Sequence, residues 1–233
     1  MNEAELRRRI DRVRERISAA AARSGRPPDA VEILPVTKGH AARAVTLVRD
    51  AGLVSVGENR VAEAEAKRES VGSLGLRWHL VGHLQRNKAA RAIRAFDVIE
   101  SVDSLRLAER LDRLAREAGR PRLPVLVEVN CSGEASKGGL PAAEALPAIA
   151  RICALQGLRV DGLMTMAPLT GDETVLRAVF TRARELLEAC ATEVPDLPGR
   201  TLSMGMSNDF EIAVEEGSTR VRLGTILFGE RPR

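Results

Sequence analysis

Short apolar runs alternate with helical patterns along most of this chain. Eight runs have the length of strands, at residues 31–37, 53–57, 78–82, 97–102, 123–130, 159–166, 201–206 and 219–228. Segments with apolar residues at helical spacing lie between most of them, at 41–51, 60–69, 104–118, 142–155, 173–191 and 208–216. Alternating strands and helices are typical of an α/β protein with a parallel sheet. Eight such units predict a TIM-type (β/α)8 barrel, formed as a single domain by residues 1–233.

An extra helix is predicted before the first strand. Leu6, Ile10, Val13 and Ile17 fall on one helical face, and acidic residues are interleaved with the arginines. This pattern indicates an amphipathic helix packed on the barrel, because a targeting segment would be poor in acidic residues. No stretch approaches the ~20 apolar residues of a membrane span. We therefore expect a soluble, cytoplasmic protein with no membrane partner.

Glycine and proline positions refine this prediction. Gly52, Gly119, Gly157 and Gly217 follow helical segments, as C-terminal caps do. Pro35 removes one hydrogen-bond donor from the first strand and predicts a local irregularity there. An open doubly wound sheet is the alternative fold. Against it, no G-x-G-x-x-G follows the first strand, and no G-x-x-x-x-G-K-[ST] occurs in the chain.

Composition removes several classes of function. The net charge of +4 is spread among interspersed acidic groups, and aromatic residues make up 2% of the chain, with no tyrosine. Nucleic-acid binding by base stacking needs aromatic side chains beside basic ones, so no nucleic-acid partner is expected. The three cysteines, Cys131, Cys153 and Cys190, are widely spaced, and the chain has no C-x-x-C motif. This spacing indicates neither a zinc site nor a disulfide framework.

Lysine is rare, which draws attention to each one. Of 36 cationic residues only four are lysines: Lys38, Lys67, Lys88 and Lys137. A Schiff base with a carbonyl compound requires a primary amine that can lose its proton, and arginine stays protonated. Lys38 closes the first apolar run, at the carboxyl end of a barrel strand, where active sites of this fold lie. Lys38 is therefore our candidate for an imine-forming lysine, with a simple strand-end lysine as the alternative.

The ends of the last two strands predict an anion site. Barrels commonly bind phosphate with the loops after strands 7 and 8, through backbone N–H groups near a helix start. Ser207, Asn208 and Asp209 form a helix N-cap cluster after the seventh run, and Gly224 and Thr225 lie in the eighth. A lysine at strand 1 and a phosphate cradle at strands 7 and 8 together describe a site for pyridoxal 5′-phosphate.

Several blocks of the chain resemble one known family. They are VTK at 36–38, VGENRVAEAEAK at 56–67, WHLVGHLQRNK at 78–88, EVNCSGEASKGGL at 128–140, GLMTMAP at 162–168 and LSMGMSNDFEIAVEEGSTRVRLGTILFGER at 202–231. In these blocks the chain is similar to the pyridoxal phosphate homeostasis proteins, whose barrel is like the N-terminal domain of alanine racemase. The resemblance implies a barrel that carries the cofactor as an imine on Lys38. Where the family usually has Lys-Thr-Lys-Pro, this chain has Lys38-Gly39-His40-Ala41.

The resemblance also implies roles for further cofactor-binding residues. Ser207 matches a phosphate-contacting serine, although a helix N-cap explains it equally well, and Gly224 and Thr225 would offer backbone amides. Arg222 would face the pyridine nitrogen, with an outward-facing surface arginine as the alternative. Asn59 would hydrogen-bond the ring hydroxyl or flank the imine, or it caps the following helix.

The histidines and Lys137 are interpreted more simply. His79 and His83 share one strand face, but no further ligand lies at metal-binding spacing, so no metal site is predicted. His83 is expected to support the site from the barrel mouth. Lys137 would cover the cofactor or capture a phosphate, but an exposed loop lysine is the favoured interpretation.

Two classes of function follow from the resemblance. An arginine at the pyridine nitrogen leaves the ring a poorer electron sink than an acidic residue would. Racemases with this arrangement use a tyrosine from a separate C-terminal domain as a second acid/base. This sequence contains neither a tyrosine nor such a domain. We favour a non-catalytic, monomeric protein of pyridoxal phosphate homeostasis that passes the cofactor to apo-enzymes, with no catalytic residues. The alternative is a pyridoxal-phosphate-dependent amino-acid racemase using another acid/base such as His83. A barrel without cofactor is the third interpretation.

Overall fold

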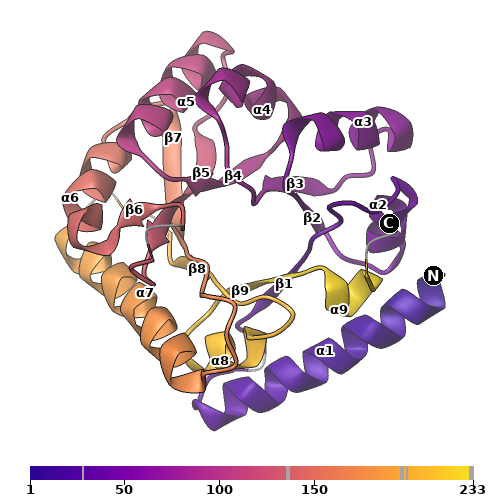
Figure 1. The fold of residues 1–233 in the computed structure, drawn as a ribbon. Helices are drawn as coiled ribbons and strands as arrows, with labels where there is room; N and C mark the ends of the chain where they lie inside the picture. Colours follow the sequence, from indigo (N-terminus) through magenta and orange to yellow (C-terminus); the bar gives the residue numbers. More distant parts are fainter. Residues whose placement is uncertain (28, 135–136, 195–196, 198, 231–233) are drawn as a thin grey trace.

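Eight parallel strands form a ring surrounded by helices in the computed structural model, which describes residues 1–27, 29–134, 137–194, 197 and 199–230 (Figure 1). The ring strands are β1 (Glu32–Pro35), β2 (Ser55–Glu58), β3 (Arg77–Leu80), β4 (Val98–Val102), β5 (Leu123–Asn130), β7 (Leu158–Met164), β8 (Thr201–Ser203) and β9 (Arg220–Leu223). A parallel bridge from Val36 to Gly57 joins β1 to β2 and closes the ring. The predicted (β/α)8 barrel is confirmed. A two-residue strand, β6 (Leu140–Pro141), pairs with β5 outside the ring.

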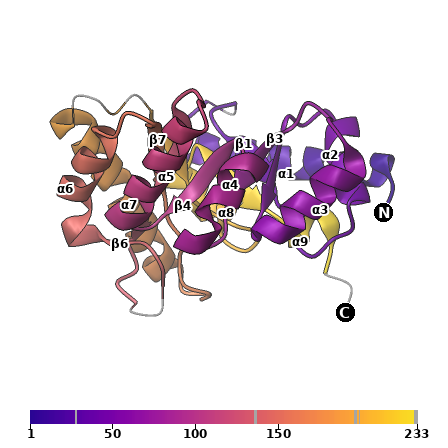
Figure 2. The same ribbon diagram turned by 90° about the horizontal axis from the view of Figure 1, so that it is seen from above.

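The helices lie outside the ring (Figure 1), and Figure 2 shows the same barrel turned by 90°. They are α1 (Glu3–Arg23), α2 (Arg43–Asp50), α3 (Val61–Val71), α4 (Ala89–Ala95), α5 (Leu105–Glu117), α6 (Ala142–Cys153), α7 (Glu173–Glu193), α8 (Phe210–Glu215) and α9 (Thr225–Phe228), with a 3-10 turn, η1, at Arg86–Lys88. The sequence pattern did not predict α4, because its buried face is mostly alanine and carries Ile93 as its one large aliphatic side chain. The last predicted strand was too long, since the chain turns at Gly224 and continues as α9.

Three of the four glycines assigned as helix caps have that role. Gly52, Gly119 and Gly217 directly follow a C-cap residue and have φ angles of 82°, 61° and 108°, which glycine adopts without strain. The assignment of Gly157 was wrong, because α6 ends at Cys153 with Ala154 as its C-cap. Gly157 instead packs against α5, where an added Cβ would lie 2.6 Å from the backbone oxygen of Asp112.

The inner and outer faces of the barrel differ in chemistry. Strand pleating points alternate side chains to opposite faces, and the outward ones pack with the helices into a continuous apolar core. Inside the ring, Leu34, Val36 and Val81 form a separate small apolar cluster. Much of the remaining interior is polar, and polar side chains of different strands contact one another there, as Glu100 of β4 does with His79 of β3 and Ser203 of β8. A polar barrel interior is suited to binding a polar ligand at one end of the strands.

The predicted N-terminal helix is confirmed as α1, which runs along α8 and α9 (Figure 1). Asn2 caps it by accepting a hydrogen bond from the Glu5 amide at 2.9 Å, and its buried face carries the four predicted apolar residues. None of the described helices is long and apolar enough to cross a membrane.

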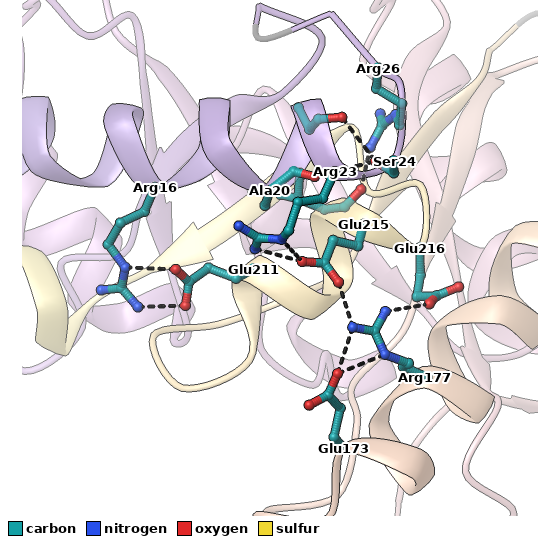
Figure 3. Close-up of polar contacts among 12 residues, drawn as sticks. Arg16, Ala20, Arg23, Ser24, Arg26, Glu173, Arg177, Glu211, Glu215 and Glu216 are labelled. Carbon is teal, nitrogen blue, oxygen red and sulfur yellow. Dashed lines mark hydrogen bonds and ion pairs between the residues drawn. The ribbon is translucent and has the colours of Figure 1, made fainter.

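Ion pairs tie α1 and α7 to α8 (Figure 3). Arg16 of α1 donates to both carboxylate oxygens of Glu211, at 3.0 and 2.7 Å. Glu215 accepts from Arg23 at 2.6 Å and from Arg177 of α7 at 2.5 Å. These side chains are partly exposed, so each pair contributes little stability by itself. Their geometric effect matters more, because α8 directly follows the loop that carries Ser207.

Candidate functional site

Lys38 lies in the turn that follows β1 at the carboxyl end of the barrel. The Thr37 amide donates to the Gly57 carbonyl at 3.0 Å, which joins this turn to the end of β2. Gly39 has a φ of 74° and lets the chain reverse directly after the lysine. The His40 ring lies 5.4 Å from the Phe228 ring of α9, measured between centroids. The Lys38 turn and α9 therefore lie side by side.

The predicted anion-binding residues gather at this same end. The Ser207 hydroxyl oxygen accepts a hydrogen bond from the Ile226 amide at 3.3 Å, which brings the loop after β8 to the start of α9. Gly224 is the N-cap of α9, and a Cβ there would lie 3.3 Å from the Val36 carbonyl oxygen. Thr225 is the exposed first residue of α9. The structure thus brings Ser207, Gly224 and Thr225 together beside the Lys38 turn.

Arg222 is buried in the barrel interior, with 5% of its surface exposed. Its Nη1 donates to the backbone and side-chain oxygens of Ser203, at 2.7 and 2.8 Å, and its Nη2 donates to the Thr165 carbonyl at 2.9 Å. Burial lowers the pKa of Arg222 from its ordinary value. The alternative of an outward-facing surface arginine is therefore wrong.

Glu100 is the centre of a buried polar network that is linked to Arg222 through the Ser203 hydroxyl. Its carboxylate accepts from Ser203 Oγ at 2.6 Å and from Arg220 Nη1 at 3.0 Å, and it lies 2.7 Å from His79 Nδ1. Burial alone would raise the pKa of Glu100, but the His79 hydrogen bond and the Arg220 charge lower it to about 2. The sequence pattern did not predict this network. The one signal for it was Glu100, a charged residue at an inward position inside the apolar strand β4.

His79 and His83 do not form one site. His79 is buried, and its Nε2 has no hydrogen-bond partner among the described residues. The His83 side chain is 67% exposed at the barrel mouth, with Nδ1 3.0 Å from Asp103 Oδ2. Among the described residues, no group of three or more His, Cys, Asp or Glu is placed to hold a metal ion.

Asn59 lies at the end of β2, beside the mouth. The N-cap of α3 is Arg60, so the interpretation of Asn59 as the cap residue is wrong. A Cβ on Gly82 would lie 2.4 Å from the Asn59 carbonyl oxygen, so glycine is required where these two strand ends meet. Asn59 and His83 line a cavity of about 320 Å³.

Glu128 is a mouth residue that sequence analysis did not single out. It is 4% exposed, and the charges that act on it are those of Asp103, Arg222 and His83. Burial and the Asp103 charge raise its pKa to about 7, against the opposing effect of Arg222 and His83. The nearby loop residue Lys137 is partly buried rather than fully exposed, with Nζ 4.0 Å from Glu134 Oε2.

Comparison with known proteins places the chain in a family. The family described as alanine racemase, N-terminal domain, matches residues 9–232. The chain belongs to this family. Its relatives in the alanine racemase N-terminal family include the pyridoxal phosphate homeostasis proteins of Pseudomonas aeruginosa and Escherichia coli. The first is 44% identical over 95% of this chain and 94% of the relative, and the second is 41% identical over 95% of each. The resemblance stated from the sequence is confirmed.

Solved structures of the family agree with the fold. PipY of Synechococcus elongatus, determined with PLP bound, is 40% identical over 93% of this chain and 100% of that chain, with a TM-score of 0.80. A protein from Bifidobacterium adolescentis has a TM-score of 0.90 at 38% identity, over 97% of this chain and 95% of that one. Alanine racemase of Clostridium difficile has a TM-score of 0.79 at 16% identity, which shows a shared fold alone. This chain covers 58% of that racemase chain.

Proposed function

We propose that this protein binds pyridoxal 5′-phosphate as a Schiff base on Lys38 and acts in pyridoxal phosphate homeostasis. One observation carries the proposal. The Lys38 turn lies beside α9, and the start of α9 is bonded to Ser207. A primary amine and an anion-binding segment thus share one end of the barrel. The names of the curated relatives and the PLP-bound PipY structure support the same ligand.

The residues at this end fit the cofactor. When bound, it supplies an aldehyde that condenses with a primary amine. We assign Lys38 as that amine, and Ser207, Gly224 and Thr225 as the phosphate-binding residues. Arg222 is assigned to the pyridine nitrogen and Asn59 to the ring hydroxyl or the imine. Because guanidinium stays protonated, Arg222 holds the pyridine nitrogen without giving it a proton.

The proposed role is to hold and release the cofactor without dedicated turnover, as a single-domain monomer in the cytoplasm. Apo-enzymes that require pyridoxal phosphate are the proposed recipients. An arginine at the ring nitrogen favours this role, because it weakens the cofactor as an electron sink. The sequence also contains no tyrosine to serve as a second acid/base.

One observation favours amino-acid racemization as a second candidate. In the ring order, β5 is four strands from β1 in either direction, so the strand of Glu128 lies opposite the strand that leads to Lys38. A buried carboxyl group with a pKa of about 7 suits proton transfer near neutral pH. Glu128, rather than the exposed His83, is the residue on which this candidate depends.

The Schiff base is tested by absorbance and chemical trapping. The protein mixed with pyridoxal phosphate should develop the visible absorption of an imine, and borohydride should fix the label on the peptide that contains Lys38. Lys38→Ala should abolish both signals, while Lys88→Ala, which removes an exposed lysine, should keep them. Label on Lys67, Lys88 or Lys137 in the wild type would contradict the assignment.

A further inference from the structure

A second lysine is buried directly behind the Lys38 turn. Lys67 of α3 is 5% exposed, and its Nζ donates three hydrogen bonds. The acceptors are the Thr37 carbonyl at 2.7 Å, Glu58 Oε1 at 2.5 Å and Glu63 Oε1 at 2.8 Å. An ammonium group has three N–H donors. All three are therefore used in this arrangement.

This cluster of Glu58, Glu63 and Lys67, here termed the Lys67 clamp, holds the chain on both sides of Lys38. On the N-terminal side, Lys67 binds the Thr37 carbonyl, and the Thr37 hydroxyl donates to Glu58 Oε1 at 2.5 Å. On the C-terminal side, the Gly39 amide donates to Glu63 Oε1 at 2.6 Å. Both neighbours of Lys38 in the chain are thus bonded to one ion-pair cluster, in which Lys67 and Glu58 are buried and Glu63 is partly exposed.

The chemistry of the clamp explains why a lysine stands at position 67 in a chain whose cationic residues are mostly arginine. Lysine carries a compact charge with three rotatable donors, whereas guanidinium is planar and presents a rigid fork. Three acceptors converge within 2.8 Å of the single Lys67 nitrogen. A planar guanidinium group cannot place one nitrogen in that position and also fit its remaining atoms without moving α3 or the turn.

Stability alone does not account for the clamp. Removing charges from water costs free energy that a buried ion pair often fails to regain, so such pairs are weak evidence for stability. Within the part of the chain that the structure describes, Glu58 Oε2 is also buried without a hydrogen-bond partner, which adds to the cost. Burial raises the pKa of Glu58 against the opposing hydrogen bonds from Lys67 and Thr37. What the clamp does provide is a single backbone arrangement around Lys38.

We propose that Lys67 is a positioning residue for Lys38, holding the backbone on both sides of that lysine so that its ε-amine meets the cofactor aldehyde in one geometry. This inference rests on the proposed function. It predicts that the clamp governs imine formation more than it governs noncovalent binding of the cofactor. A purely structural role would affect both equally.

The test compares two ligands in Lys67→Met, with Lys88→Met as the matched control. Pyridoxal 5′-phosphate reports imine formation by absorbance, and 4-deoxypyridoxine 5′-phosphate, which has no aldehyde, reports noncovalent binding. Lys67→Met should weaken imine formation at least about tenfold, the equivalent of losing one hydrogen bond to a charged group, while binding of the deoxy analogue stays within about twofold. Lys67→Arg should not restore imine formation.

Several outcomes would overturn the proposal. They are imine formation in Lys67→Met equal to that in Lys88→Met, equal loss of both ligands, or full rescue by arginine. If Lys67→Met does not fold, Glu63→Ala is the second test. Glu63 is partly exposed, and its removal frees the Gly39 amide but leaves the Lys67–Glu58 ion pair in place. Glu63→Ala should then show the same selective loss, and unchanged imine formation would refute the idea. Absence of an imine in the wild type would instead refute the proposed function.

Discussion

Glu100 and Glu128 stand on the neighbouring strands β4 and β5 inside one barrel, yet their pKa values move in opposite directions, to about 2 and about 7. Both carboxyl groups are buried, and burial raises the pKa of each. Glu100 is hydrogen-bonded to His79 and Ser203 and paired with Arg220, which reverses the effect. Glu128 has Asp103 as a charged neighbour, and this negative charge raises the pKa of Glu128 further. The interior is thus ionised at its centre and able to hold a proton at its mouth.

Replacing Glu128 should change the pH dependence of stability near neutrality. Its folded pKa of about 7 lies above the ordinary value of 4.5, so the group costs stability as pH rises from 4.5 through 7. At one pKa unit per ~1.4 kcal/mol, Glu128→Gln should be more stable than the wild type by up to about 3 kcal/mol above pH 8, and equal to it near pH 4. Urea unfolding across this pH range measures the difference. A difference independent of pH would contradict the assignment.

Glu100→Gln should have the opposite effect. A folded pKa of about 2 means that Glu100 contributes stability above pH 4.5, which is lost as pH falls through 2. The variant should lose on the order of 3 kcal/mol at pH 7, and the loss should shrink in acid. Glu32→Gln is the matched control, because Glu32 also pairs with Arg220 but is partly exposed. Equal losses of unfolding free energy in the two variants would show that the buried network around Glu100 stabilises the fold no more than the partly exposed Glu32–Arg220 pair does.

Ser207→Ala should weaken binding of pyridoxal 5′-phosphate by roughly 1.5–3 kcal/mol, since a hydrogen bond to a charged acceptor is lost. Pyridoxal, which lacks the phosphate, should be indifferent to the change. The affinities of both ligands are measured by absorbance titration, with Ser18→Ala on α1 as the control. Equal weakening of both ligands would show that Ser207 serves α9, through its bond to Ile226, rather than the phosphate.

The protein should racemize common amino acids slowly or not at all. Racemization needs proton transfer on both faces of the α-carbon, and loss of one positioned acid/base typically removes ~10²–10⁴-fold of rate. Lys38 can serve one face, and the sequence has no tyrosine for the other. Chiral chromatography after incubation with L-amino acids measures the rate. Turnover at ~1–10³ per second would contradict the homeostasis role, and its loss in Glu128→Gln would then identify the second acid/base.

The sequence by itself determined the barrel and which residues share its mouth. In a parallel barrel all strands end on one side, so locating the strand ends was enough to bring Lys38, Ser207 and Gly224 together before any contact was known. The hydrophobic pattern did not predict α4, because the buried face of that helix is mostly alanine and gives little contrast with its polar face. The pattern also failed at the chain end, where Gly224 turns an apolar run into α9.

Only the tertiary structure decided which polar residues meet inside the barrel. Glu100 reaches Ser203 across 103 residues of sequence, and Lys67 reaches Thr37 across 30. Strand alternation indicates which side chains point inward, but the partners depend on the stagger of the strands around the closed ring. Those partners determine the opposite pKa shifts of Glu100 and Glu128, and they also form the Lys67 clamp behind Lys38. For this reason the position of the candidate site could be predicted from sequence, while its electrostatics required the fold.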